Sequence, residues 1–357
     1  MSMSDRMRVL VVFGGRSGEH EVSVMSARTV VDAVEVLGHE AVGVGITRDG
    51  VWLRSDPRDV ERVTDGEPFP FVVGGRDRGP VDVAFPVLHG PHGEDGTIQG
   101  LFEVTQIPYV GSGVDGSVIG INKVVQKRLF SEAQIPVVDF VAFDRAGWER
   151  EGRAIRDAVD KLGYPSFAKP VNLGSSVGIS KVHGPDELDA AAERALRHDD
   201  EVIVEAAGFA RELEVGVLGE PPEVSVVGEV VPDGEFYDYR AKYRGAWTQL
   251  QIPADVPGPV AGAAADLALR AFRTARCEGL ARVDFFFDAA TETLIVNEVN
   301  TLPGLTPASM FPKVWEASGV PFPEVVRRLI DHALVRAQRR RELEDARASA
   351  HDEEVGS

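Results

Sequence analysis

The sequence predicts a protein of mixed α/β and α+β class, built from more than one domain. Its 357 residues exceed what one compact core normally holds, and a hydrophobic content of 43% is enough to form several cores. The chain opens with a strand, a glycine turn and a helix, which together are the unit of a parallel α/β domain. Further along, short strands alternate with helices in two more regions. We therefore expect an N-terminal parallel α/β domain followed by two further domains.

The first domain is expected over residues 1–121. An apolar run at 8–13 indicates a buried strand, and apolar residues three to five positions apart after it indicate a helix. Short apolar runs at 42–46 and 81–88, bounded by Gly, Pro and Asp, predict further strands. The segment 54–79, rich in Asp, Arg, Pro and Gly, is predicted to be an irregular surface connection.

The pattern changes at Asn122, so a second domain is expected over 122–211 and a third over 212–336. The elements predicted in the second are helices 123–133, 153–162 and 185–196 and strands 137–143, 166–169, 178–182 and 202–205. The elements predicted in the third are strands 212–218, 224–231 and 282–287 and a helix over 261–276. Residues 337–357 are highly charged and lack a core-facing stripe, which predicts a disordered tail.

Charge and cysteine content narrow the possible functions. The formal net charge of −19 repels nucleic acid and anionic membrane surfaces, because binding them needs a basic face that this sequence does not show. A single cysteine, Cys277, leaves no pair for an internal disulfide, and no apolar stretch reaches membrane-spanning length. The apolar run at 9–13 is also too short for a secretory signal. We expect a reduced cytoplasmic protein that binds neither nucleic acid nor membrane.

Two glycine-rich loops follow strands of the first domain. The segment 14–21 lies before a helix start, where backbone N–H groups and the helix dipole favour an anion. A tight turn alone explains its glycines, but Glu19 at the end of a parallel strand can hold a ligand ammonium group. The glycines of 89–96 allow the backbone to approach a small ligand closely. A surface turn with incidental histidines is the alternative there, and metal binding by His89 and His92 is not expected.

A lysine ends the strand predicted at 166–169. Lys169 precedes a Gly/Ser turn at 174–178, whose N–H groups and hydroxyls can fold over phosphoryl oxygens while the lysine supplies a point charge. The segment does not match the Walker pattern, so a P-loop is excluded. A solvated lysine at a strand end is the alternative, and this segment alone does not decide between the two.

Charged and amide side chains recur at alternate positions in two strands of the third domain. Alternation places Arg282 and Asp284 on one face of one strand, and Glu298 and Asn300 on one face of another. If these strands are neighbours, two carboxylates and an amide converge beside a guanidinium, and such oxygen ligands suit Mg²⁺ shared with phosphates. Cross-strand charge pairing is the alternative. The segment 303–306 then offers a backbone N–H where an oxyanion could form.

These segments, in this order, closely resemble the D-alanine–D-alanine ligase family of the ATP-grasp superfamily. The resemblance extends to about Leu334 and is carried by GGRSGEHEVS, HGPHGEDGTIQG, AKPVNLGSSVGISKV, FYDYRAKY, LARVDFF and NEVNTLPGLTPAS. It implies an ATP-grasp fold, with an N-terminal α/β substrate domain, a central ATP-grasp domain and a C-terminal catalytic ATP-grasp domain. It also implies ATP-dependent ligation of two D-alanines through D-alanyl phosphate, for peptidoglycan precursor synthesis. Two Mg²⁺ (or Mn²⁺) ions and a homodimer are implied as well.

The resemblance assigns substrate roles residue by residue. Glu19 would bind the ammonium group of the first D-alanine, with His89 near the same subsite. Ser309 would receive the carboxylate of the second D-alanine, and Arg282 with the N–H of Gly304 would form the oxyanion hole. On a loop that the family closes over the site, Tyr243 would complete a hydrogen-bonded triad with Glu19 and Ser175.

The resemblance also assigns the nucleotide and metal residues. The expected ATP-binding residues are Lys123, Lys169, Ser176, Glu205, Glu212 and Lys242. Of these, Glu205 and Glu212 would contact the adenine and ribose. The expected metal ligands are Asp284, Glu298 and Asn300.

Three alternatives share parts of this pattern. A D-alanine–D-lactate ligase would keep the fold, but Tyr243 argues against it. Another ATP-grasp carboxylate–amine ligase would share the phosphate and metal residues without the combination of Glu19, Tyr243 and Ser309. A nucleotide-binding regulator that has lost catalysis would be expected to lack a metal ligand or Arg282, and the sequence retains them all.

Overall fold

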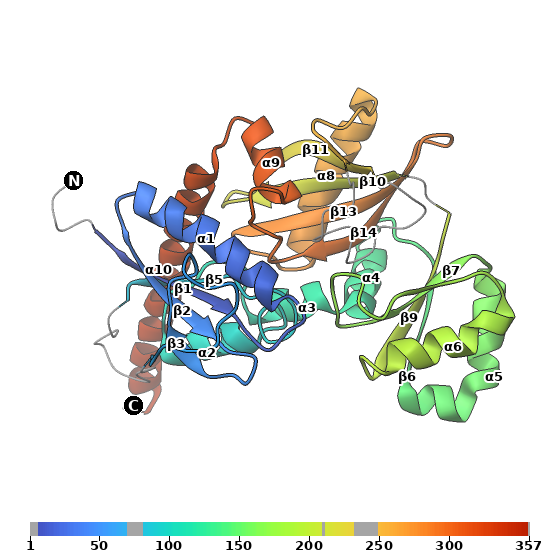
Figure 1. Ribbon diagram of the computed structural model, residues 1–357, viewed down its shortest axis with the longest axis horizontal. Coiled ribbons are helices and arrows are strands. Elements are labelled where there is room, and N and C mark those ends of the chain that lie inside the picture. Colours follow the sequence, from blue (N-terminus) through green and yellow to red (C-terminus); the bar gives the residue numbers. More distant parts are fainter. Residues whose placement is uncertain (1–5, 70–80, 209–210, 232–248, 356–357) are drawn as a thin grey trace.

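The computed structural model describes residues 6–69, 81–208, 211–231 and 249–355. Over these ranges the chain forms three sheets, each covered by helices (Figure 1). In that view the first sheet lies at the left, the second at the lower right and the third above and between them. The mixed α/β and α+β class predicted from the sequence is confirmed, whereas the domain boundaries stay a prediction.

The first sheet has the strand order β4-β3-β2-β1-β5. Its elements are β1 (Arg8–Gly14), α1 (His20–Val36), β2 (Glu40–Ile46), β3 (Trp52–Arg54), β4 (Glu67–Pro68), β5 (Val83–Pro86), α2 (Thr97–Thr105) and α3 (Val114–Ile121). As predicted, β1 runs parallel to β2 and β5. The antiparallel strands β3 and β4 were not predicted, and β3 follows β2 through a short turn closed by the Thr47 N–H bond to Val51 O.

The second sheet is antiparallel, in the order β6-β9-β7-β8. The elements of this region are α4 (Lys123–Glu132), β6 (Phe140–Asp144), α5 (Arg145–Leu162), β7 (Ser166–Pro170), β8 (Ser180–Val182), α6 (Pro185–Leu196) and β9 (Glu201–Ala206). Helix α5 begins eight residues earlier than predicted. The Asp144 carboxylate accepts the Gly147 N–H at 2.6 Å and so caps the helix ahead of its apolar stripe.

The third sheet is also antiparallel, in the order β12-β11-β10-β13-β14. Its elements are β10 (Arg211–Leu218), β11 (Glu223–Val231), β12 (Gln249–Gln251), α8 (Gly258–Thr274), β13 (Leu280–Asp288), β14 (Thr293–Asn300) and α9 (Met310–Ala317). Val215 and Val217 share a core with α8, while Gly216 faces α9, so the two helices cover opposite faces. A Cβ on Gly216 would lie 2.6 Å from the Trp315 indole nitrogen, which is why glycine allows α9 to pack so closely.

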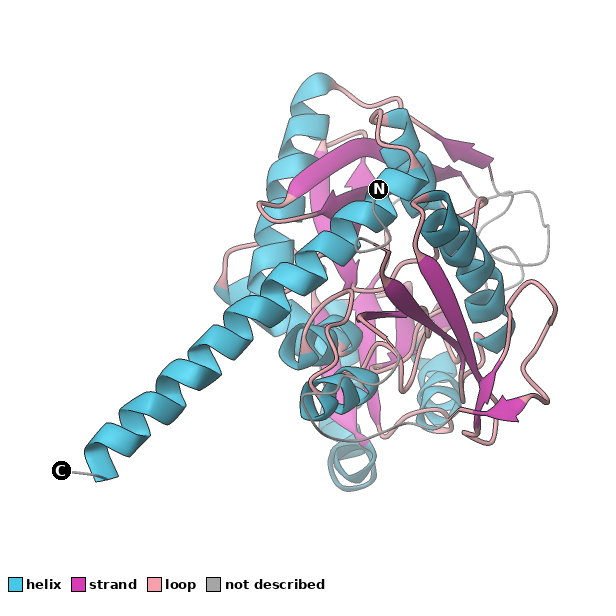
Figure 2. Ribbon diagram, turned by 90° about the vertical axis from the view of Figure 1, so that its left-hand side faces the viewer, coloured by secondary structure: helices cyan, strands magenta, loops and turns pink. Residues whose placement is uncertain are grey.

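Helix α10 (Phe322–Val355) corrects the prediction of a disordered tail. Its first half packs against α1, and the Arg336 guanidinium donates to the carbonyls of Tyr109 and Gly111 and contacts Glu278. Beyond Arg336 the helix continues to Val355 and extends away from the body (Figure 2). An ion pair between Arg340 and Glu103 holds its base. The tail lacks an apolar stripe, as noted from the sequence, but Arg, Glu and Ala are strong helix formers.

Within the described ranges, none of the helices combines the length and the apolar character needed to cross a lipid bilayer.

Candidate active site

Glu19 lies where loops from the first and second sheets meet. It directly precedes α1, and the hydroxyl of Ser175, in the loop after β7, donates to its carboxylate. The loop after β5 also approaches closely, since a Cβ on Gly90 would lie 3.1 Å from a Glu19 oxygen. Ser175 and Ser176 both adopt left-handed φ values, 51° and 58°. Residues other than glycine rarely adopt this backbone conformation, and those that do cluster at functional sites.

His89 connects the first sheet to the loop that follows β14. Its Nδ1 donates to the Leu302 carbonyl at 3.1 Å, and its Nε2 lies 3.1 Å from the Ser26 hydroxyl. The same hydroxyl oxygen accepts the Leu305 N–H at 3.3 Å. Burial would lower the pKa of His89, but the nearby carboxylates, Glu94 foremost, outweigh it and raise that pKa. The roles of Ser26 and Glu94 as neighbours of His89 were not predicted from the sequence.

Gly304 and Ser309 lie together in the loop after β14. A Cβ on Gly304 would lie 2.7 Å from the Ser309 hydroxyl oxygen, and that hydroxyl is 2.8 Å from the Thr306 hydroxyl. Glycine therefore lets the loop fold tightly against Ser309. We call Glu19, His89, Ser175, Gly304 and Ser309 the loop site, because each lies in or beside a connection rather than within a strand.

Strands β13 and β14 are neighbours, as the sequence interpretation of Mg²⁺ binding requires. Their register sets Arg282 opposite Asn300 and Asp284 opposite Glu298. The Arg282 guanidinium donates to both Asp284 oxygens, at 2.7 and 2.6 Å, and its Nε lies 3.0 Å from a Glu214 oxygen. Charge pairing, the alternative weighed from the sequence, is therefore present as well. We call Glu214, Arg282, Asp284, Glu298 and Asn300 the strand site.

The strand site has the donor chemistry that Mg²⁺ takes when phosphates supply its other ligands. Asp284 and Glu298 offer two carboxylates and Asn300 one amide oxygen on adjacent strands, without nitrogen or sulfur ligands. Among the described residues, no group of three or more His, Cys, Asp and Glu side chains is placed so that it could hold a metal ion, so an ion here would need other ligands as well. Two carboxylates and an amide thus fit an ion shared with a bound nucleotide.

Lysines from α4 and β7 face the strand site. Lys123 Nζ donates to the Leu173 carbonyl at 2.7 Å and lies 3.4 Å from a Glu298 oxygen. Lys169 Nζ donates to Glu205 at 2.6 Å, and the buried Lys127 lies 3.0 Å from the other Glu205 oxygen. Burial would raise the pKa of Glu205, but the two ammonium groups outweigh it and lower that pKa to about 2. Lys127 was not singled out from the sequence.

The remaining predicted residues divide into two groups. Glu212 lies on β10 and adds to the negative charge around Lys169, and Ser176 lies in the loop after β7. Lys242 and Tyr243 fall outside the described residues. Glu214, which the sequence analysis missed, alternates with Glu212 along β10, and this period of two was the signal that could have revealed it.

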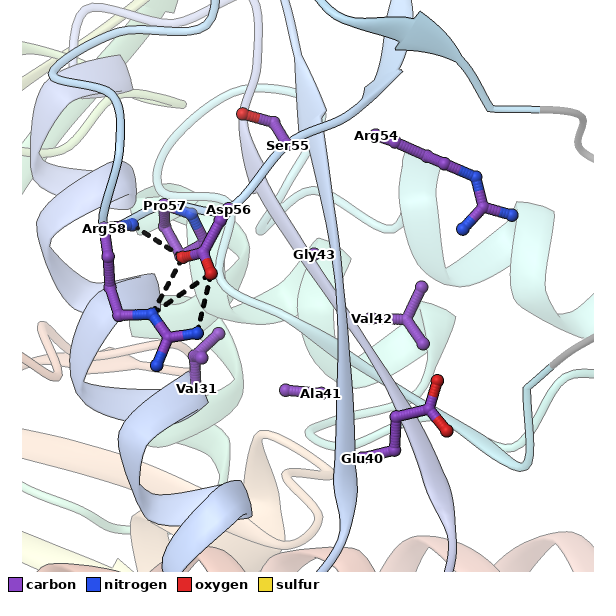
Figure 3. A pocket seen from close by; sticks show the side chains of 10 residues that line it. All are labelled: Val31, Glu40, Ala41, Val42, Gly43, Arg54, Ser55, Asp56, Pro57 and Arg58. Atoms are coloured by element: carbon purple, nitrogen blue, oxygen red, sulfur yellow. Dashed lines mark hydrogen bonds and ion pairs between the residues drawn. The ribbon is translucent and has the colours of Figure 1, made fainter.

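A surface pocket of about 370 Å³ lies elsewhere, beside β2 and β3 (Figure 3). Arg58, which lines it, donates to both Asp56 oxygens and also pairs with Glu35. The pocket is lined by Val31, Glu40, Ala41, Val42, Gly43, Arg54, Ser55, Asp56, Pro57 and Arg58. It contains none of the loop-site or strand-site residues.

Comparisons with known proteins agree with this geometry. The protein-family model described as D-ala D-ala ligase N-terminus matches residues 8–112, and the family model described as D-ala D-ala ligase C-terminus matches residues 129–331. A D-alanine–D-alanine ligase of Heliobacterium modesticaldum is 45% identical over 93% of this chain and 95% of its own length. One of Geobacillus kaustophilus is 41% identical over 95% of this chain and 97% of its own length.

Two solved structures extend the likeness to the whole fold. The D-alanine–D-alanine ligase of Coxiella burnetii superposes with a TM-score of 0.86 at 30% identity, covering 97% of this chain and 99% of that one. A D-Ala:D-Ser ligase of Enterococcus faecalis superposes with a TM-score of 0.80 at 34% identity, covering 92% of this chain and all of that one.

The ligases that this chain matches in sequence and structure have the ATP-grasp fold, so the chain is an ATP-grasp enzyme, an ATP-dependent ligase of a family that depends on a divalent metal. Within that class, the chain belongs to the D-alanine–D-alanine ligase family. Its substrates are D-alanine and ATP, and its product serves peptidoglycan synthesis.

Proposed function

We propose that this chain binds two D-alanine molecules at the loop site, with ATP between the second and third sheets and two Mg²⁺ ions at the strand site. The observation that carries the proposal is the register of β13 and β14. It sets Asp284 opposite Glu298 and Arg282 opposite Asn300, with Lys123 within 3.4 Å of Glu298. Oxygen ligands thus lie beside two cations, Arg282 and Lys123, which suits a metal-bound triphosphate.

The first step activates a carboxylate. A carboxylate oxygen of the first D-alanine attacks the γ-phosphorus of ATP, the bond from that phosphorus to the ADP oxygen breaks, and D-alanyl phosphate forms. Bound Mg²⁺ supplies charge neutralisation at the phosphoryl oxygens. Lys123, Lys169 and Ser176 would hold the phosphates, and Arg282 would hold the transferred group. Glu19 would orient the D-alanine through its ammonium group.

The second step forms the peptide bond. The amine of the second D-alanine, after losing a proton, attacks the acyl carbon, and the tetrahedral intermediate expels phosphate. Arg282 and the Gly304 N–H would stabilise the oxyanion, while Ser309 would receive the carboxylate of the incoming D-alanine. Water must be kept out of the site because an acyl phosphate hydrolyses. Lys242 and Tyr243, on the loop that the family closes over the site, would contribute to excluding it.

We also propose that the enzyme works in the cytoplasm, where ATP is available, and that it forms a homodimer as the family resemblance implies. Light scattering after size-exclusion chromatography tests the dimer, for which the expected mass is twice the 38.6 kDa of one chain.

One assay tests the ligation itself. Phosphate release from ATP is measured with D-alanine, L-alanine, D-lactate or D-serine as substrate, and the products are identified by mass. We expect D-alanyl-D-alanine with D-alanine alone. D-Lactate and D-serine are each supplied together with D-alanine, so that they can compete with it as the second substrate. A mixed product formed faster than D-alanyl-D-alanine would contradict the proposed choice of second substrate.

A further inference from the structure

One buried cation near the proposed nucleotide has no role in the mechanism above. The Lys127 side chain is only 1% exposed, yet it carries an ammonium group into the interior. That group donates to the Asn297 carbonyl at 2.9 Å and lies 3.0 Å from a Glu205 oxygen. A buried charge is costly unless it is paired and hydrogen-bonded, and Lys127 meets both conditions.

The position of Lys127 follows from helix α4. Lys123 and Lys127 are four residues apart and share one face of the helix. Lys123 lies against Glu298, while Lys127 reaches Glu205 on β9 and the backbone of β14 one residue before Glu298. Lys127 therefore touches both the second and the third sheet. It links Glu205, which is proposed to contact the adenine and ribose, to β14, which carries proposed metal ligands.

The charges around Glu205 are unequal in number. Its side chain is 2% exposed and lies between two ammonium groups, those of Lys127 and Lys169. If Lys169 left Glu205 to hold a phosphate, Lys127 would still pair with the carboxylate. Without Lys127, the buried carboxylate would have Lys169 as its remaining lysine partner, and the attraction between them would oppose phosphate binding.

We propose that Lys127 is a positioning residue for the nucleotide, which holds Glu205 in place and leaves Lys169 available for phosphate. The inference rests on the proposed assignment of Glu205 and Lys169 to the ATP site. Lys127 acts through Glu205 and the Asn297 carbonyl and does not touch the nucleotide itself.

A double-mutant cycle tests this role. The four proteins are the parent, Lys127→Met, Glu205→Gln and the variant with both changes, and each is measured for ADP affinity by calorimetry and for KM and kcat. We expect Lys127→Met to weaken ADP binding and raise KM for ATP by about tenfold, the effect of one lost charged hydrogen bond. KM for D-alanine should stay unchanged. The double variant should bind ADP no more weakly than the weaker single variant, because both changes remove one interaction.

A matched control comes from the same helix. Gln126 bonds to both the N–H and the carbonyl of Val299 on β14 but carries no charge and does not contact Glu205. Gln126→Leu should lower the melting temperature without weakening ADP binding, and its effect should add independently to that of Glu205→Gln.

Each result has one meaning. Unchanged ADP affinity in Lys127→Met, or losses that multiply in the double variant, would overturn the role of Lys127 alone. Unchanged ADP affinity in Glu205→Gln would remove Glu205 from the nucleotide site. It would overturn both the proposed assignment of Glu205 to the ATP site and the role of Lys127 that rests on it. If Lys127→Met does not fold, Glu205→Gln is compared with the double variant, in which no buried carboxylate is left without its partner. Equal ADP affinity then supports the inference, and a further loss overturns it.

Discussion

The strand site and the loop site hold their functional groups in different ways. In the strand site, the backbone ladder between β13 and β14 sets which side chains face each other. In the loop site, the groups come from connections far apart in the chain, and side-chain hydrogen bonds hold them together. His89 and Leu302, for example, are 213 positions apart. A change in the strand site should therefore remove chemistry from an intact frame, whereas a change in the loop site should also loosen the frame.

The largest expected effect is in the strand site. Glu298→Gln keeps the shape of the side chain but removes a charge from the proposed metal ligands, so kcat should fall by roughly a hundredfold to a thousandfold. The melting temperature should change little, because the ladder stays intact. Initial rates over a range of Mg²⁺ concentrations measure the effect.

The control for that variant is Glu292→Gln, in the exposed turn between the same two strands. It should leave kcat unchanged. A fully active Glu298→Gln enzyme would remove this residue from the metal site.

Arg282→Lys should have the next largest effect. The planar guanidinium holds both Asp284 oxygens and approaches Glu214, and a lysine cannot reproduce that fork. Losing one charged hydrogen bond, roughly 1.5–3 kcal/mol, predicts a rate lower by about tenfold to a hundredfold. Single-turnover measurement of ADP formation would separate this chemical step from product release.

Arg211→Lys is a matched comparison, since Arg211 holds both oxygens of Glu229 on the same sheet. We expect that variant to lose some stability and far less rate. Equal rate losses in the two variants would mean that Arg282 serves the sheet rather than the reaction.

In the loop site, Ser26→Ala should affect binding and stability together. It removes the hydroxyl between His89 and the Leu305 N–H, and each buried group left without a partner costs about 1–3 kcal/mol. We expect KM for D-alanine to rise by roughly tenfold and the melting temperature to fall, with KM for ATP unchanged.

Ser23→Ala provides the comparison for that variant. Ser23 is also buried on α1 and bridges the Gly14 N–H and the Val87 carbonyl, without reaching the loop after β14. It should cost similar stability with a smaller change in KM. If both variants raise KM equally, the bridge through His89 has no special part in substrate binding.

The difference between the two sites also explains what the sequence could predict. Alternation along a single strand placed Arg282 with Asp284 and Glu298 with Asn300, and the sequence left open whether the two strands are neighbours, which the pairing of β13 with β14 answers. The same rule could have revealed Glu214. The bridge from Ser26 through His89 to Leu305 follows no local period, because it depends on how separate elements pack. The family resemblance names His89 and Ser309 without showing their neighbours. The helix in 337–355 is not predicted by an apolar stripe, because this segment has none and forms a helix through the propensity of its residues.

The smallest effect is expected far from both sites, in the projecting end of α10. Truncation after Arg336 keeps the buried guanidinium that clamps Tyr109 and Gly111 but removes the pair between Arg340 and Glu103. That pair is partly exposed, 40% and 31% at its two side chains, so it contributes about 0–1 kcal/mol. A loss of about 1 kcal/mol shifts the melting temperature of a domain of about 150–250 residues by about 2–4 °C, and the shift becomes smaller as the chain becomes longer. We therefore expect a shift of about 2 °C or less here. Catalysis should stay unchanged, because in the described part of the chain no hydrogen bond or ion pair joins the removed segment to a residue of either site. Calorimetry of the truncated enzyme beside Arg340→Gln is the test, and the single substitution should reproduce most of the shift. A much larger shift, or a loss of activity in the truncated enzyme alone, would contradict this prediction. Either result would indicate that the projecting helix packs against another chain, and the proposed homodimer would be the contact to test.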